Sequence, residues 1–390
     1  MDFSDAPEEI EFRRELREWL SRVVPALGSE PETLEDRLPR WRRWQQQLHE
    51  AGYAGLSWPS EHGGRGVGVL LQAIFAEECD QAGAPDRLNI LGEGLLGPTL
   101  IDFGTDEQKS RFLGAILKGD SLWCQLFSEP NAGSDLAALQ TKAQRDGNGW
   151  RINGQKVWSS RAQIADWGIL LARTGAPNSK HRGITYFLLD MRQPGVSVRP
   201  LRHMLGGTDF NEVFIDNVWV GDDCVVGGVD DGWRIAMATL SYERVALATG
   251  RVNTQQAIND LVAQVREAKN SDGQRLGEDP VVRQKMADLY LRTTLQRLTG
   301  KRILSAMAEG ASPGAEVSTA KLFSTALVEE IADFAVGSFG LAGQEDPDSM
   351  NANSRWLRLA YQARGTSIAG GSTFIQRNIV AERVLGLPKA

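Results

Sequence analysis

The stretch Gln125–Asp135 reads QLFSEPNAGSD, and the rest of the chain is organised around it. It follows the apolar pair Leu122 and Trp123. Apolar residues that lead into Pro, Asn and Gly are typical of a strand that breaks into a tight loop. Small residues there let backbone N–H groups approach a ligand, and the hydroxyls of Ser128 and Ser134 can form hydrogen bonds. An ordinary turn explains the same residues, so this stretch alone leaves both interpretations open.

The composition narrows the class of protein. The chain has 390 residues, enough for two or three domains, and its apolar and charged shares of 42% and 24% are ordinary for a soluble globular protein. A net charge of −7 argues against nucleic acid or an anionic membrane as a partner. Three distant cysteines and four scattered histidines show no metal-ligand spacing. With no signal peptide and no apolar run of about 18 residues, we expect a cytoplasmic protein without a membrane span.

Hydrophobic periodicity divides the chain into three parts. Apolar residues at steps of three and four predict helices in the first part, and a spacing of two predicts strands from about residue 121 to 226. Within that region Asn153-Gly154 predicts the turn of a hairpin over Trp150–Trp158. Helical spacing then returns, with one long helix expected from Trp233 to Lys269. We therefore expect an α+β protein with a helical domain (1–120), a β domain (121–228) and a C-terminal helical bundle (229–390).

Four motifs, in this order, resemble the acyl-CoA dehydrogenase family. They are SEPNAGSD at Ser128–Asp135, INGQKVW at Ile152–Trp158, RGI at Arg182–Ile184 and IQRNIVAER at Ile375–Arg383. The resemblance covers essentially the whole chain and implies the family fold, with a β-barrel-like middle domain. It also implies an FAD-dependent oxidoreductase of fatty acid β-oxidation that converts an acyl-CoA to its trans-2-enoyl form. A carboxylate would remove the α-proton while a hydride leaves the β-carbon for flavin N5, and an electron-transferring flavoprotein would accept the electrons.

The resemblance also assigns a set of cofactor-binding residues. Ser128 is expected near the flavin ring, Gly133 at the pyrophosphate, Ser134 at both the pyrophosphate and the CoA arm, and Trp158 beside the isoalloxazine. Core or turn positions would explain the same residue types without a cofactor. The full set is Gln125, Phe127, Ser128, Gly133, Ser134, Trp158, Ser159, Ser160, Ser372 and Phe374.

The usual catalytic glutamate of the family is missing. In most members it stands just before a Gly-Thr, seven residues ahead of the arginine that corresponds to Arg377. That position is Gly370 here. Glycine cannot abstract a proton, although its backbone N–H can still polarise the thioester carbonyl together with the flavin ribityl hydroxyl.

Glu243 is the candidate replacement. A smaller group of relatives, including isovaleryl-CoA dehydrogenases, carries the base on the helix after the β domain, directly before an arginine, as Glu243-Arg244 stands here. An apolar enclosure would raise the pKa of Glu243 from its ordinary value of about 4.3 and make it a better base. An exposed helical charge pair is the alternative. The substrate-binding residues implied by the resemblance are Ser134, Ser241, Tyr242, Arg244, Gly370 and Gly371.

A second departure concerns the FAD tail. Family homotetramers use an Arg-x-x-Phe-Gly and a glutamine to reach a neighbour's FAD, and the corresponding positions are Lys269–Gly273 and Gly337. Asp272 would place a negative charge near a diphosphate, which is unfavourable. Both departures resemble actinobacterial α2β2 acyl-CoA dehydrogenases that degrade steroid side chains. We therefore predict a second acyl-CoA dehydrogenase-like subunit, with a homo-oligomer as the alternative, and a bulky or branched acyl group.

Two other functions stay open. The first is a non-catalytic FAD-site subunit, which Gly370 taken alone would suggest and which substrate-dependent bleaching of bound flavin would exclude. The second is a desaturase or oxidase that acts on a carrier-bound acyl group. Reactivity of the reduced flavin with oxygen, and a choice between carrier-protein and CoA thioesters, would identify it.

Overall fold

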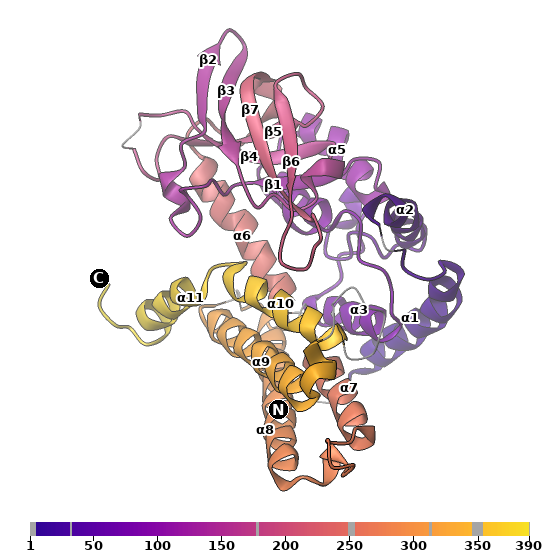
Figure 1. The fold of residues 1–390 in the computed structure, drawn as a ribbon. Helices are drawn as coiled ribbons and strands as arrows, with labels where there is room; N and C mark the ends of the chain where they lie inside the picture. The colour runs from indigo at the N-terminus through magenta and orange to yellow at the C-terminus, as the bar shows by residue number, and fades with distance from the viewer. Residues whose placement is uncertain are drawn as a thin grey trace. The chain divides into compact units, whose positions relative to one another are not determined.

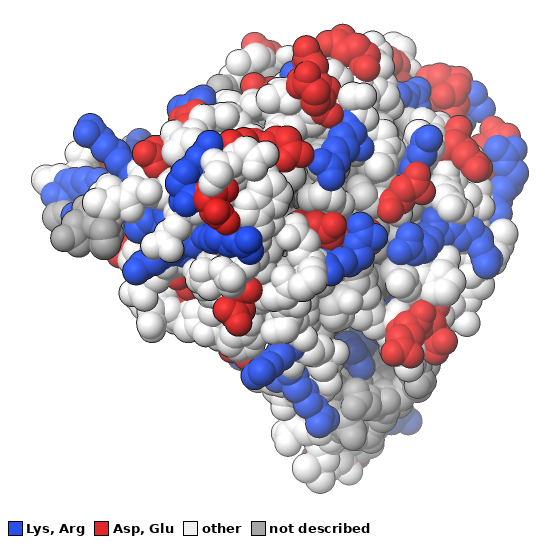
Figure 2. Space-filling model, turned by 90° about the horizontal axis from the view of Figure 1, so that it is seen from above, with Lys and Arg blue, Asp and Glu red and all other residues white. Residues whose placement is uncertain are grey.

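The computed structural model of the protein describes residues 5–31, 33–176, 179–248, 254–311, 314–344 and 354–389, without the side chains of 243–248 and 342–343. The chain forms two compact units that divide between Glu243 and Arg244. Figure 1 shows the helices and strands of both. Acidic and basic side chains are interspersed on the face drawn in Figure 2.

The first unit begins with helices, as the periodicity predicts. Thr105 caps the helix that begins at Asp106. Its hydroxyl accepts the N–H of Gln108, and the Gln108 side-chain oxygen accepts the N–H of Thr105. Pro25 lies inside the last turn of the first helix, which ends one residue later at Ala26. The helices are α1 (Pro7–Ala26), α2 (Leu34–Glu50), α3 (Val69–Gln81), α4 (Gly97–Phe103) and α5 (Asp106–Lys118), with a π-helical turn at Gly92–Leu96 before α4.

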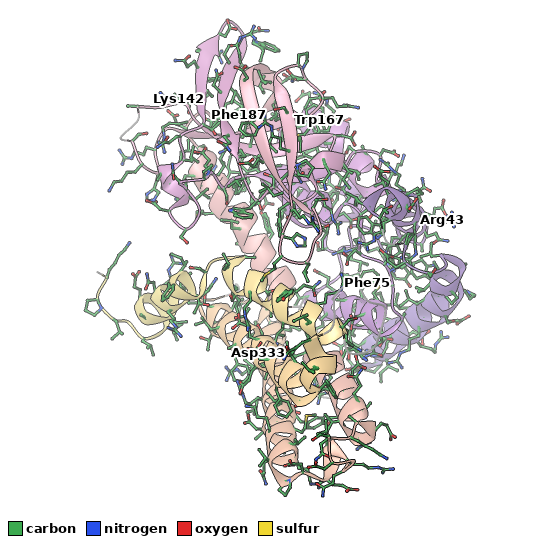
Figure 3. All side chains as sticks on the ribbon, in the orientation of Figure 1. Arg43, Phe75, Lys142, Trp167, Phe187 and Asp333 are labelled. Atoms are coloured by element: carbon green, nitrogen blue, oxygen red, sulfur yellow. The ribbon has the colours of Figure 1, made fainter. Side chains whose placement is uncertain are left out.

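A mixed sheet follows in the same unit. Its strands are hydrogen-bonded in the order β6-β7-β3-β2-β4-β5-β8, and β1 pairs in parallel with β4. Trp167 on β4 and Phe187 on β5 are both buried, and Figure 3 shows them among the side chains of the sheet. The strands are β1 (Trp123–Leu126), β2 (Lys142–Asp146), β3 (Gly149–Lys156), β4 (Trp167–Arg173), β5 (Ile184–Asp190), β6 (Val196–Leu201), β7 (Phe210–Gly221) and β8 (Val225–Val226).

The predicted turn at Asn153-Gly154 is wrong. Both residues lie inside β3, where the register against β7 shifts between Ile152 and Gly154. The Asn153 side chain accepts the N–H of Asn217 across this irregularity, at 2.8 Å. A Cβ at Gly154 would lie only 2.3 Å from the Thr141 hydroxyl, so the glycine is needed for close packing rather than for a turn.

A buried ion pair fixes the loop after β1. The Lys156 ammonium at the end of β3 donates to Glu129 Oε1 at 2.8 Å and to the Phe127 carbonyl at 3.2 Å. Glu129 also accepts the backbone N–H groups of Gln140 and Thr141, at 2.6 and 2.9 Å. Burial lowers the pKa of Lys156 to about 8, against the attraction of Glu129. Burial also opposes ionisation of Glu129, but the Lys156 charge and these hydrogen bonds outweigh it and lower the pKa of Glu129.

The helix α6 (Gly232–Ala248) follows the sheet, and the second unit is helical. The single helix expected over 233–269 is described as α6 and α7, and residues 249–253 between them lie outside the described residues. The core of this unit is a cluster that includes Leu261, Leu289, Ile331 and Trp356. The remaining helices are α7 (Thr254–Glu267), α8 (Pro280–Ala308), α9 (Glu316–Ser338), α10 (Ser354–Ile368) and α11 (Thr373–Ile379), followed by a π-helical turn at Val380–Val384.

In the first unit, the π-helical turn Gly92–Leu96 and α4 pack against a buried tryptophan. Trp58 is buried, and its indole N–H donates to the Glu93 carbonyl at 3.0 Å. A Cβ at Gly97 would lie 1.8 Å from Trp58 Cζ2, whereas a Cβ at Gly94 would meet nothing within 4 Å. Only one of the two glycines is therefore required by packing.

We expect Gly97→Ala to destabilise the protein by about 1–3 kcal/mol, because the added methyl group must displace the Trp58 ring. Gly94→Ala is the matched control and should be neutral or slightly stabilising, because it restricts the unfolded chain without a clash. Urea unfolding followed by tryptophan fluorescence measures both. Equal stabilities for the two variants would contradict the packing argument.

We expect Lys156→Met to destabilise the protein by about 3–5 kcal/mol, because it leaves the Glu129 carboxylate buried without its cation. Adding Glu129→Gln should restore much of the loss, since the amide oxygen still accepts the N–H groups of Gln140 and Thr141. Chemical denaturation of both variants tests this.

The matched control is Arg145→Met, which breaks the solvent-exposed pair with Asp222. Solvent screens such a pair, so its removal should hardly change the midpoint of unfolding. A loss for Lys156→Met no larger than that for Arg145→Met would show that burial of the first pair is without consequence.

Candidate active site

The loop after β1 is held by backbone hydrogen bonds and carries polar groups that have no partner among the described residues. Glu129 and Ala132 exchange backbone hydrogen bonds of 3.1 and 3.0 Å, which close a tight turn. The Ser128 carbonyl accepts the N–H of Val157 at 2.9 Å, while the Ser128 hydroxyl has no hydrogen-bond partner among the described residues. Gly133 and Ser134 are exposed beyond the turn, and the space around Gly133 is open. The loop is thus a turn, as its residues predict, with free groups at its surface.

Gln125 and Phe127 lie where β1 leads into this loop. The Phe127 side chain is buried and packs edge-on against the Tyr186 ring, with centroids 6.0 Å apart. Gln125 is half-buried in β1. Phe127 therefore lies in the core, and its carbonyl is taken by the Lys156 ammonium.

Trp158 has a strained backbone and an exposed ring. Its φ is +59°, a left-handed conformation that bulky residues rarely adopt. The residues on either side are fixed, since Val157 donates to the Ser128 carbonyl and Ser159 donates to the Asn211 carbonyl at 3.1 Å. The indole is 63% exposed and meets the Phe210 ring edge-on at 6.1 Å. The constraint presents a broad aromatic face to solvent, which suits stacking on a planar ligand.

Buried polar atoms without partners lie beside Trp158. Ser159 is fully buried, and its hydroxyl has no partner in the described part of the chain. The same holds for Asn211 Oδ1, although the Asn211 amide donates to the Ser159 carbonyl at 3.0 Å. Buried polar groups in native proteins are almost always paired, so these two mark a place where a ligand or water completes the bonding. Ser160 is half-buried.

Two hydroxyl contacts join α6 to α4. Thr239 and Thr99 share a buried hydrogen bond of 2.8 Å, and the Tyr242 hydroxyl donates to the Asp102 carboxylate. Burial and the neighbouring Asp102 charge raise the pKa of Tyr242. The Ser241 hydroxyl donates to the Ala238 carbonyl of its own helix, at 2.6 Å. Both predicted substrate hydroxyls on this helix are therefore already bonded within the protein.

Glu243 and Arg244 follow directly on α6. Their side chains lie outside the described residues, so the structure gives the helix that carries them and no contacts.

The second unit contains the glycine turn between α10 and α11. Gly370 and Gly371 have φ values of +64° and +90°, which glycine adopts at no steric cost. The Ser372 hydroxyl accepts the N–H of Ile375 and caps α11, so it is already used within the chain. The Phe374 ring is 75% exposed.

Within the first unit, the sequence-predicted residues of the loop and of β3 come together. The bond from Val157 to Ser128 brings Trp158, Ser159 and Ser160 beside the loop. The buried Lys156–Glu129 pair that supports them is not predicted by the sequence motifs, although both residues belong to those motifs. The one available signal was a lysine at an inward position of a strand. The described residues contain no cluster of His, Cys, Asp and Glu that could hold a metal ion.

Comparisons with known proteins agree with this geometry. The family models for the N-terminal, middle and C-terminal domains of acyl-CoA dehydrogenases match residues 6–120, 124–218 and 230–385. Acyl-CoA dehydrogenase IpdE1 of Mycobacterium tuberculosis is 39% identical, with 97% of this chain and 98% of that protein aligned. No helix in the described residues has the length and apolar character that a membrane crossing requires.

Solved structures give the same result. A chain of the ChsE4-ChsE5 complex from Mycobacterium tuberculosis superposes with a TM-score of 0.87 at 32% identity, and the Tcur3481-Tcur3483 steroid ACAD gives 0.87 at 29%. Both alignments cover 100% of each chain. The resemblance seen in the motifs is therefore confirmed over the whole length, and the chain belongs to the acyl-CoA dehydrogenase family.

Proposed function

We propose that this chain is an FAD-dependent dehydrogenase that converts an acyl-CoA thioester to its trans-2-enoyl form. The observation that carries the proposal is the constrained, exposed indole of Trp158 next to the Ser128 hydroxyl, which has no partner in the part of the chain that the structure describes. A flat aromatic face beside a free hydroxyl and buried unpaired polar atoms suits an isoalloxazine ring, which is planar and has polar edges.

The residues of this chain would bind and orient the flavin and the acyl-CoA and would accept the α-proton. Trp158 and Ser128 would hold the flavin ring, while the exposed Gly133 and Ser134 would reach the pyrophosphate and the CoA arm. When bound, FAD supplies the acceptor for the hydride from the β-carbon. Glu243 would take the α-proton. The electrons would then pass to an electron-transferring flavoprotein.

The conformation of Gly370 supports a base elsewhere. A side chain at φ +64° is strained, so a glutamate does not fit this backbone as it stands. The missing side chain also leaves space, which supports a bulky substrate such as a steroid-linked acyl group. A structural relative, the Tcur3481-Tcur3483 steroid ACAD, agrees with that choice.

We further propose that a second acyl-CoA dehydrogenase-like chain completes the FAD site. The segment that would reach a neighbour's FAD is a self-contained turn here. Its Asn270 side chain accepts the N–H groups of Asp272 and Gln274, at 3.0 and 2.9 Å. Asp272 is exposed at this turn and carries a negative charge. The structural relative from the ChsE4-ChsE5 complex is one chain of an assembly of two different chains.

We expect Glu243→Gln to lower the turnover rate with an acyl-CoA by about 10³-fold or more, because the amide cannot accept the α-proton. Flavin binding should be retained. Stopped-flow bleaching of the flavin measures the step directly. Glu267→Gln, an exposed change on α7, is the control and should retain full activity. Substantial turnover by Glu243→Gln would rule out this base, and a wild-type complex that never bleaches would favour the non-catalytic subunit.

We expect the chain expressed alone to bind little FAD, because its turn at 270–273 opposes a diphosphate. The complex purified from its host through a tag on this chain should contain a second, related chain and a full complement of flavin. Mass spectrometry of the intact complex and flavin absorbance give the composition. A homotetramer with one FAD for each chain would refute the partner.

A further inference from the structure

A buried lysine is hydrogen-bonded to carbonyl groups of the glycine turn. Lys321 on α9 is only 8% exposed, and its ammonium donates to the carbonyls of Ala369, at 2.6 Å, and of Gly371. The carbonyl between them, that of Gly370, accepts the side-chain amide of Gln376 at 2.8 Å. Three consecutive carbonyls are therefore directed toward two side chains of the same unit.

The direction of these carbonyls fixes the direction of the N–H groups. In a trans peptide the carbonyl and the following N–H point in opposite directions. The N–H groups of Gly370, Gly371 and Ser372 are thus turned away from Lys321 and Gln376. They donate no hydrogen bond to any other residue that the structure describes, and Gly370 is exposed. They are free to bind an oxygen that carries negative charge.

The lysine charge adds to this arrangement. A cation at the carbonyl end of a row of peptide dipoles makes the potential at the N–H end more positive. Because Lys321 is buried, solvent screens its field less than it would screen an exposed charge. Lys285, on α8 of the same unit, has its ammonium on the carboxylate of Glu330.

We propose that Lys321 is a positioning residue that turns these N–H groups toward the thioester carbonyl and strengthens their polarisation of it. The inference rests on the proposed dehydrogenase function. In that reaction the α-C–H bond breaks, its proton goes to Glu243, and its electron pair moves into an enolate whose charge lies on the thioester oxygen. FAD, when bound, would supply the acceptor for the β-hydride, whose loss leaves the C=C bond. Groups that stabilise the enolate oxygen lower the barrier to proton removal.

The test uses the complex purified through this chain, with Lys321→Met as the variant and Lys285→Met as the matched control. We expect kcat of Lys321→Met to fall about 10- to 100-fold with a small change in KM, less than the roughly 10²- to 10³-fold loss of a direct donor. Infrared difference spectra of a bound trans-2-enoyl-CoA with a ¹³C-labelled carbonyl should show its stretch at higher frequency. Lys285→Met should leave both unchanged.

The spectrum separates polarisation from folding. If Lys321→Met does not fold, Lys321→Gln keeps a donor to the carbonyls without the charge, and its carbonyl stretch should still rise. An unchanged stretch in a folded, flavin-bound variant would overturn the inference. A wild-type complex that neither binds nor oxidises any acyl-CoA would instead refute the proposed function.

Discussion

The buried pair of Lys156 and Glu129 is the constraint on which the rest of the candidate site depends. Taking two charges out of water costs several kcal/mol each, and the cost is offset only when further hydrogen bonds satisfy both groups. Glu129 meets this condition by accepting two backbone N–H groups, and Lys156 meets it with the Phe127 carbonyl. The pair therefore joins the loop after β1, the segment before β2 and the end of β3 at a single point. The left-handed backbone of Trp158 follows two residues later and depends on that support.

The same physical device occurs in the second unit. Lys321 is buried and donates to carbonyls of the glycine turn, as Lys156 donates to the carbonyl of Phe127. In both places a cation takes up backbone acceptors. Among the described residues, the groups without a partner are the Ser128 hydroxyl, which can donate or accept, in one unit and the N–H groups of Gly370 and Gly371 in the other. In each unit, groups that can donate a hydrogen bond suit ligands with carbonyl, phosphate or enolate oxygens, as the proposed flavin and acyl-CoA have.

Sequence reasoning predicted the three-part fold because helical and strand periodicities are local, and the family because its motifs are spread along the chain. The predictions were wrong where contacts between residues distant in the sequence determine the local structure. Asn153-Gly154 is a strong turn signal, yet Gly154 is required by the Thr141 side chain, which lies beside it in space and not in sequence. The roles of Lys156 and Lys321 were invisible for a related reason. A lysine is exposed by default, and only the structure reveals the acceptors that make its burial tolerable.

The left-handed glycine turn links the two departures of this chain from its family. A glutamate at position 370 would need a backbone that an L-residue tolerates, while the observed φ values suit only glycine well. In the proposed function, a turn with this conformation would present N–H groups, and another element would supply the base that removes the proton. Glu243 on α6 is a carboxylate supplied by a regular helix, which imposes no conformational strain on its position. In the proposed function the donor that stabilises the enolate and the base that creates it would come from different elements. The turn would then carry no side chain at position 370, which is the reason for proposing a bulkier acyl group.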